Sequence, residues 1–409
     1  MATLHPFRAI RPVRDKVHLV ATRPYYAYKS NVLKAKLQDN PFTLLHIINP
    51  EFDKTHKTKA NSTARFELVK KGYASFLEKG ILIQDPTPHL YVYRQSTLDH
   101  SYTGIIGGAD ADDYLNDVIK KHEATLTARE QVFTQYLDIV GLNAEPVLMA
   151  YPRNDRIHSL LDQVVKDRPE YEFSTTDLVK HELWVVPHEI AEEIIALFQS
   201  IEATYIADGH HRSASSVAYY QHQKEKGNRD AGKAFLSYYV EEDTLTILEF
   251  QRLVKHRNGY SVHDLLNRLR EVGQLTLLDS PRKPSKCHEI TLYLDGKGYA
   301  LQCDDTKLHH NHPTESLDSE ILTQQILTPI LGIADLKTSE DVAFIPGNTL
   351  MTEVLRLIDQ GEYALAFFLY PVTMEEVKKV ADAGLHMPPK STWVEPKLRS
   401  GLTIMDIHG

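Results

Sequence analysis

The 409-residue chain is poor in cysteine, with only Cys287 and Cys303. Two cysteines without metal-ligand spacing exclude a disulfide-stapled scaffold and a cysteine-based zinc site. The chain also lacks any apolar run near the roughly 18–20 residues that span a bilayer as a helix. No apolar run of signal-peptide length stands near Met1. We therefore expect a cytoplasmic protein without a membrane partner.

An excess of positive charge is also missing. Lysine and arginine number 46 against 55 aspartates and glutamates, which gives a formal net charge of −9. Proteins that mainly grip a nucleic-acid backbone usually carry a basic excess or a basic stripe. The composition therefore argues against nucleic acid as the principal partner. Apolar residues at 42% and charged residues at 25% are typical of a globular protein, and the length suggests two or three domains.

Short apolar strands interspersed with amphipathic helices predict a mixed α/β or α+β layer architecture. We place a domain boundary near residue 245, between an α/β part at 1–245 and an α+β part at 246–409. Helices are expected at 65–79, from Asp110 to about Ile119, and at 127–139. Strands are expected at 43–48, 147–151 and 205–207, with hairpins that join 234–240 to 245–250 and 290–294 to 299–302.

The most informative segment is Asp208-Gly209-His210-His211-Arg212, which is predicted to turn tightly between a strand and a helix. A helix N-terminus presents unpaired N–H groups and a positive dipole end, so it attracts anions. Arg212 adds a fork of donors suited to phosphate, and Gly209 permits a sharp turn and a close ligand approach. The segment predicts a cradle for phosphate or carboxylate. An Asp-Gly turn before a helix also occurs as an ordinary helix start.

Three other clusters carry polar chemistry. Glu51 follows the expected strand at 43–48 and is either a functional or a surface carboxylate. His122 and Glu123, at the expected end of a helix, form either an acid/base or metal-binding pair or a helix end with favourable basic charge. Lys390, Ser391 and Thr392 offer a point charge and hydroxyl donors, which suit phosphate but also fit a surface loop.

Four blocks in order give the chain a recognisable pattern: Pro6-Phe7-Arg8-Ala9, Ile119-Lys120-Lys121-His122-Glu123-Ala124-Thr125, Ala207-Asp208-Gly209-His210-His211-Arg212 and Met387-Pro388-Pro389-Lys390-Ser391-Thr392. In these blocks the chain resembles the bacterial and archaeal "domain of unknown function 1015" family over nearly its whole length. One departure is Arg23-Pro24-Tyr25-Tyr26, where relatives resemble one another in Pro-Pro-Tyr-Asp.

The Asp-Gly-His-His-Arg turn is also similar to the Gly-x-His-Arg phosphate-binding turn of the ParB/sulfiredoxin superfamily. That superfamily includes nucleotide hydrolases, sulfiredoxin and free-serine kinases that use ADP or ATP. The resemblance implies a ParB/sulfiredoxin-like nucleotide-binding core with a second α+β part. It also implies a phosphotransferase of serine biosynthesis that converts free L-serine to O-phosphoserine with Mg²⁺ and ATP or ADP.

By this resemblance the nucleotide phosphates would lie on Gly209, His210, His211 and Arg212. The chemistry of the residues predicts the other roles, with Asp208 holding Mg²⁺ directly or through water. The residues expected to close over the phosphates or the substrate carboxylate are Lys390, Ser391 and Thr392. The proton of the serine hydroxyl would pass to Glu123 or Glu51, with His122 and His210 as the other catalytic candidates.

Two other functions fit the same residues. A phosphoserine phosphatase would hold the substrate phosphate in the same cradle, with His210 or His211 as a general acid or phosphate acceptor. A non-enzymatic nucleotide sensor or a ParB-like nucleic-acid-binding protein would use the cradle without chemistry. Nucleotide dependence separates the kinase from the phosphatase, and a steep salt dependence of DNA affinity would favour the last alternative.

Overall fold

A computed structural model describes residues 1–24, 27–52, 57–309, 312–336 and 338–408. The described chain forms two units. The first comprises residues 1–120, 125–245 and 396–409, and the second comprises residues 246–395, with which contacts also group the four residues 121–124. The chain therefore leaves the first unit at Leu245 and returns to it at Pro396.

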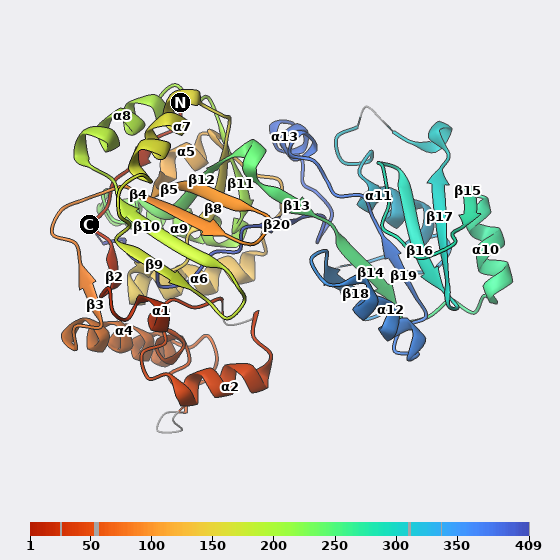
Figure 1. Ribbon diagram of the computed structural model, residues 1–409, viewed down its shortest axis with the longest axis horizontal. Coiled ribbons are helices and arrows are strands. Elements are labelled where there is room, and N and C mark those ends of the chain that lie inside the picture. The colour runs from red at the N-terminus through yellow and green to blue at the C-terminus, as the bar shows by residue number, and fades with distance from the viewer. Residues whose placement is uncertain (25–26, 53–56, 310–311, 337, 409) are drawn as a thin grey trace. The chain divides into compact units, whose positions relative to one another are not determined.

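A nine-stranded mixed sheet forms the centre of the first unit, in the order β6-β11-β8-β12-β5-β4-β10-β9 with β1 beside β5 (Figure 1). Its strands are β1 (Leu4–His5), β4 (Tyr91–Ser96), β5 (Ser101–Asp110), β6 (Ile119–Lys120), β8 (Val147–Tyr151), β9 (Tyr171–Ser174), β10 (Lys180–Val185), β11 (Thr204–Asp208) and β12 (Ala234–Glu241). Short pairs β2 (Ile10–Pro12) with β3 (Leu82–Gln84) and β7 (Leu142–Asn143) with β21 (Met405–Asp406) complete the unit. The predicted mixed α/β class is confirmed.

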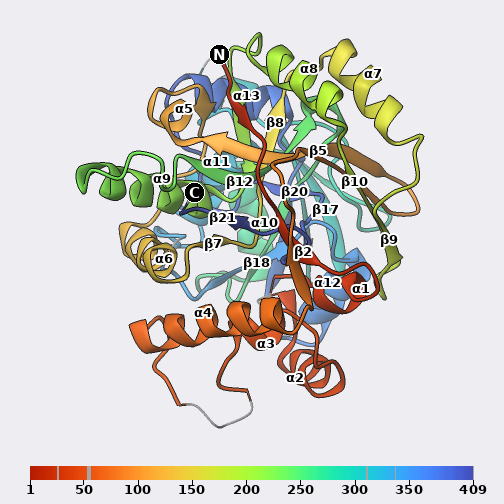
Figure 2. The ribbon, with the colours of Figure 1, turned by 90° about the vertical axis from the view of Figure 1, so that its left-hand side faces the viewer.

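Helices bury apolar stripes against this sheet or against one another. They are α1 (Val17–Val20), α2 (Ser30–Asp39), α3 (Leu45–Ile48), α4 (Thr63–Glu78), α5 (Ala111–Leu115), α6 (Thr127–Val140), α7 (Asp155–Val164), α8 (His188–Phe198) and α9 (His210–Glu225). Buried residues of α7 and α8 join the sheet in one core. Helices α6 and α9 pack side by side, and α3 lies against α4 (Figure 2).

A six-stranded antiparallel sheet forms the second unit, in the order β15-β17-β16-β19-β14-β18. Its strands are β14 (Phe250–Val254), β15 (Gly273–Leu277), β16 (Glu289–Leu294), β17 (Lys297–Cys303), β18 (Val342–Pro346) and β19 (Leu365–Phe368), beside the pair β13 (Thr246–Leu248) and β20 (Trp393–Glu395). Its helices are α10 (Val262–Arg270), α11 (Asp318–Leu322), α12 (Met351–Asp359) and α13 (Met374–Asp382). The two faces of the sheet carry separate apolar cores.

Several local predictions are confirmed. The helices expected at 65–79 and 127–139 are α4 and α6, and the strand expected at 147–151 is β8. The hairpin of β16 and β17 turns at Asp295 and Gly296, whose φ angles of 52° and 72° are those that a two-residue turn of this hand requires. No helix in the described part of the chain is both long enough and apolar enough to cross a membrane.

Three local predictions are wrong. The segment 43–48 forms the short helix α3 rather than a strand, because a five-residue apolar run fits either structure. The helix after Asp110 ends at Leu115, and Ile119 and Lys120 form strand β6. The strand that follows β12 pairs with β20 instead of folding back as a hairpin.

Candidate active site

Strand β11, a single glycine and helix α9 build the predicted Asp-Gly-His-His-Arg turn. The pairing of β11 with β8 shifts register between Ile206 and Asp208. This β-bulge changes the direction of the strand just before the turn. Gly209 has a φ of 108°, and a Cβ there would lie 3.0 Å from the guanidinium carbon of Arg212. Helix α9 then begins at His210. The strand, turn and helix predicted for this segment are confirmed, and the backbone requires glycine at 209.

Asp208 binds two cationic side chains of the first unit. Its Oδ2 accepts a hydrogen bond from Arg212 Nη2 at 2.8 Å, and its Oδ1 accepts one from Lys397 Nζ at 3.1 Å. Burial acts to raise the pKa of Asp208, but Lys397 and Arg212 outweigh it and lower the pKa to about 2. Mg²⁺ coordination by Asp208 stays a prediction, and the ion would share the carboxylate with Arg212 and Lys397.

Arg212 is further fixed by a hydrogen bond from Nη1 to the carbonyl of Pro146. Its side chain keeps 25% of its surface exposed, so the guanidinium is positioned and still reachable. The serines that follow point elsewhere: Ser213 Oγ donates to the carbonyl of His210 at 3.0 Å, and Ser215 Oγ donates to that of His211 at 2.7 Å. The hydroxyls of Ser213 and Ser215 are therefore used within the helix, and the cationic groups at this turn are Arg212 and Lys397.

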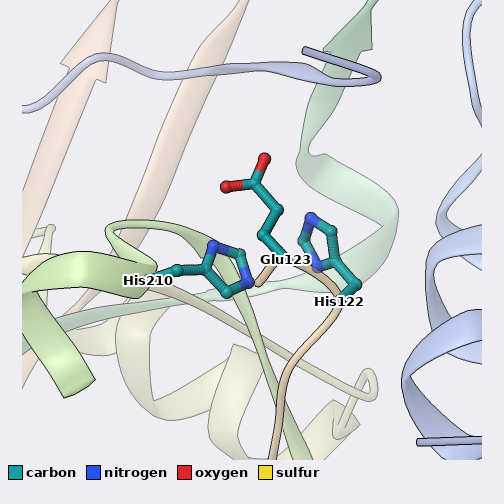
Figure 3. A group of neighbouring side chains, drawn as sticks. All are labelled: His122, Glu123 and His210. Carbon is teal, nitrogen blue, oxygen red and sulfur yellow. The ribbon is translucent and has the colours of Figure 1, made fainter. Parts of the chain in front are cut away.

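His122, Glu123 and His210 form a second polar group at the same edge of the sheet. Strand β6 pairs parallel to β11, with Ile119 opposite Thr204. Because both strands run the same way and Lys120 pairs with Tyr205, the chain after β6 continues beside the last residues of β11, toward the start of α9. One ligand atom from each of the three side chains lies within 4.8 Å of the others. Figure 3 shows the two imidazole rings on either side of the Glu123 side chain.

This group combines burial with access. His122 is 1% exposed and His210 is 4% exposed, whereas Glu123 is half-buried. Residues 121–124 are bonded at both ends to the first unit, between β6 and the segment that leads into α6. The structure thus brings together three of the four predicted catalytic residues. His211, in the first turn of α9, is half-buried and is not one of the three.

Glu51, the fourth predicted catalytic residue, lies in a different environment of the first unit. Its Oε1 accepts a hydrogen bond from Arg65 Nε at 2.9 Å and another from the hydroxyl of Thr58. Burial acts to raise the pKa of Glu51, but the bonds from Thr58 and Arg65 lower it overall. A carboxylate held in this way is a weaker base than an ordinary glutamate. Tyr25 and Tyr26, which stand where relatives of the family resemble one another in Tyr-Asp, lie outside the described residues.

Lys390, Ser391 and Thr392 belong to the second unit. The exposed Lys390 has its Nζ 5.2 Å from the centroid of the Phe250 ring, a cation–π contact. Ser391 is 4% exposed, and its hydroxyl donates to the carbonyl of Pro388 at 2.8 Å and lies 3.1 Å from Ser319 Oγ. The Ser391 hydroxyl is therefore part of the packing of this unit, and a phosphate role for the block stays a prediction.

Lys397 is the residue at the turn that the sequence analysis did not single out. It stands 189 positions from Asp208, so neither spacing nor periodicity connects the two. Its one visible signal was a second lysine shortly after the Lys-Ser-Thr triplet.

The family match covers the first three of the four sequence blocks, up to residue 320. The profile of the family described as "Protein of unknown function (DUF1015)" matches residues 4–320. A comparison with curated proteins finds no match.

Three solved structures illustrate the structural similarity. A mutant free serine kinase in complex with ADP shares 15% identity at a TM-score of 0.36, over 74% of this chain and 91% of that chain. SbnI with a C-terminal truncation, from Staphylococcus aureus, shares 13% identity at a TM-score of 0.38, over 73% and 87% of the respective chains. A conserved hypothetical protein from Pyrococcus furiosus shares 15% identity at a TM-score of 0.34, over 74% and 95%.

Proposed function

The chain belongs to the family described as "Protein of unknown function (DUF1015)", and from that premise we propose that it is a phosphotransferase that acts on free L-serine. ATP or ADP is the donor in this proposal, and O-phosphoserine is the product. The observation that carries it is the turn at Asp208–Arg212, where a helix start and two cationic side chains meet at one carboxylate.

The turn supplies what phosphoryl transfer needs first, which is positioning and neutralisation of charge. The start of α9 is the positive end of the helix dipole, which favours a bound anion. Arg212 and Lys397 add two fixed positive charges whose side chains are 25% and 32% exposed. A phosphate chain laid across Gly209 would meet backbone donors and both cations. His210 and His211 begin the same helix and complete the proposed cradle.

Glu123 is the better of the two candidate bases. It lies beside His122 and His210 at the start of α9, where the phosphates are proposed to bind. Glu51 is paired with Arg65 and has a lowered pKa, which weakens it as a proton acceptor. Glu123 therefore takes the serine hydroxyl proton in this proposal. Lys390, Ser391 and Thr392 are proposed to contact the phosphates or the substrate carboxylate, as the family resemblance implies.

Phosphorus NMR tests the proposal directly. Purified protein is incubated with Mg²⁺, L-serine and either ATP or ADP, and D-serine replaces L-serine in a parallel sample. Phosphoserine that forms at the expense of nucleotide only with L-serine is the expected result. Absence of phosphoserine with both nucleotides, in protein that is folded by circular dichroism, contradicts it.

Two matched variants test the choice of base. Glu123→Gln is expected to reduce the turnover rate by about 10²–10⁴-fold, the usual contribution of a general base. Glu51→Gln is the control, and its rate is expected to stay within a few-fold of the wild type. The opposite ranking would reassign the base to Glu51.

Phosphoserine hydrolysis is the second candidate reaction. The buried imidazole of His210 beside the carboxylate of Glu123 favours it, because such a pair can serve an acid or a phosphate acceptor. Release of inorganic phosphate from O-phosphoserine without nucleotide would replace the kinase by the phosphatase. A salt-sensitive affinity for DNA, without either reaction, would support the nucleic-acid-binding alternative.

A further inference from the structure

The group of His122, Glu123 and His210 has the composition of a transition-metal site. We infer that these three side chains bind one divalent first-row transition metal ion, with Zn²⁺ as the best fit. This inference concerns metal binding alone, and it holds whether or not serine is the substrate. An ion held through one oxygen of the Glu123 carboxylate would leave the second oxygen for the serine proton. It differs from the Mg²⁺ predicted at Asp208, whose two oxygens already bind Arg212 and Lys397.

The donor set selects the class of ion. Two imidazoles and one carboxylate are a common set for catalytic Zn²⁺, which uses three protein ligands and leaves a position for water or substrate. Imidazole nitrogen suits zinc, iron, nickel and copper, whereas Mg²⁺ and Ca²⁺ prefer sites made of oxygen. Two nitrogens among three donors therefore favour a transition metal.

The separation of the donor atoms is close to what an ion would require. The three ligand atoms lie within 4.8 Å of one another. Zn–N and Zn–O bonds of about 2.0–2.2 Å in a tetrahedral site place ligand atoms about 3.3–3.5 Å apart. An ion would therefore require the group to contract by no more than about 1.5 Å, and the half-buried Glu123 side chain has the rotatable bonds for most of this movement.

One ligand stands at the start of a helix, and the other two stand in the short segment that follows β6. His210 is the first residue of α9 and follows the bulged end of β11, and His122 follows β6, the parallel neighbour of β11. Both histidines are at most 4% exposed, so their rings lose little freedom when an ion binds. Glu123 is half-buried, which leaves one side of the group accessible for the entry of an ion.

Cobalt binding followed by visible absorption tests the inference. Full-length protein is stripped with a chelator, dialysed and titrated with Co²⁺, whose d–d bands report tetrahedral or five-coordinate ligands. We expect binding of one Co²⁺ per chain, displacement by Zn²⁺ and no displacement by excess Mg²⁺. The chain has 21 histidines, so variants must separate this site from adventitious surface binding.

The substitutions His122→Gln, Glu123→Gln and His210→Gln are each expected to weaken Co²⁺ binding by at least about tenfold, since loss of even an outer partner of a ligand costs 10–100-fold. His211→Gln is the matched control, because His211 neighbours His210 in α9 but is not in the group. Its Co²⁺ affinity is expected to equal that of the wild type. Glu123→Asp keeps a carboxylate and is expected to retain part of the binding.

Thermal unfolding without metal shows whether each variant is folded. If a histidine variant does not fold, Glu123→Gln still tests the site, because Glu123 is the least buried of the three residues. Absence of a d–d band in the wild type overturns the inference. So does binding that survives all three ligand substitutions. Tight Co²⁺ binding without phosphoserine formation would retain the metal site and reject the kinase. Phosphoserine formation with Mg²⁺, without tight Co²⁺ binding, would support the kinase and reject the metal site.

Discussion

The polar regions around Asp208 and around Ser391 differ in how far their side chains are exposed. Around Asp208 in the first unit, the carboxylate holds two cations whose side chains remain a quarter to a third exposed. Around Ser391 in the second unit, the hydroxyl groups of Ser391 and Ser319 are buried and lie against one another. Both regions looked suited to phosphate in the sequence. The difference shows that the exposure of the polar side chains, more than their type, separates the two regions.

Asp208 and Asp318 differ in the direction in which their surroundings shift the carboxyl pKa. Asp208 has two cationic partners that lower its pKa to about 2. Asp318, at the start of α11, accepts hydrogen bonds from the backbone N–H groups of His288 and Tyr370, but burial dominates and raises its pKa to about 7. The first carboxylate is charged at neutral pH and organises cations, and the second shares in the packing of its unit.

Gly209→Ala is expected to have the largest effect. An alanine at φ 108° is strained, and its Cβ would lie 3.0 Å from the Arg212 guanidinium. We expect a loss of about 2–3 kcal/mol in the free energy of unfolding, together with loss of nucleotide binding. Urea unfolding and a nucleotide titration measure the two effects.

Gly227→Ala is the matched control for that change. Gly227 has a φ of 89°, and a Cβ there would meet nothing within 4 Å. It should lose stability through backbone strain alone and keep its nucleotide affinity. Equal loss of binding in both variants would refute the special role of the turn.

Arg212→Ala is expected to weaken phosphate or nucleotide binding by about 10–100-fold while the fold persists, because charge-assisted hydrogen bonds are worth about 1.5–3 kcal/mol. Calorimetric titration with ADP measures it. Arg156→Ala, at an exposed arginine of α7 that pairs with Glu193, is the control and should bind like the wild type. Unchanged affinity in a folded Arg212 variant would remove the cradle from the proposal.

Lys390→Ala asks whether the block in the second unit also contributes to activity. The family resemblance leads us to expect a loss of at least roughly tenfold in activity, about 1.4 kcal/mol. Lys379→Ala, at an exposed lysine of α13 that pairs with Glu375, serves as the reference. A wild-type rate for the Lys390 variant would confine the block to a structural role and would sharpen the contrast between the two regions.

The pH dependence of stability is expected to differ in sign between Asp208 and Asp318, with effects on the order of 1 kcal/mol. The pKa of Asp208 is depressed in the folded state, so its contribution is present above about pH 4 and lost as the pH falls toward 2. The pKa of Asp318 is raised, so folded stability decreases as the pH rises from about 4 to 7. Urea unfolding of Asp208→Asn and Asp318→Asn across this range should flatten each trend separately; parallel curves for the two variants would contradict the comparison.

Local signals predicted the turn well and its surroundings poorly. The strand, glycine and helix at 204–225 follow from a β-branched apolar segment, an Asp-Gly pair and a helical pattern that stand next to each other in the chain. The neighbours of the turn come from distant segments. The pairing of β6 with β11 and the contact of Lys397 with Asp208 depend on tertiary structure, which periodicity does not report.

The mistaken elements have a common cause. The apolar run at 44–48 forms a helix because Leu44, Leu45 and Ile47 all become buried beside α4, and helical spacing permits this as well as a strand would. The end of α5 at Leu115 was missed because the apolar residues Val118 and Ile119 continue a helical spacing, while the chain turns at Asp117, whose φ is 59°. Short apolar segments leave helix and strand undecided until burial selects one.

The return of the chain at Pro396 determines the order in which the protein is completed during synthesis. Residues 1–245 of the first unit are synthesised before residues 246–395, whereas Lys397 and strand β21 are synthesised after them. In a nascent chain, Asp208 therefore lacks the hydrogen bond from Lys397 until Lys397 has left the ribosome. Premature termination anywhere in the second unit would release a first unit that has its turn but not its second cation.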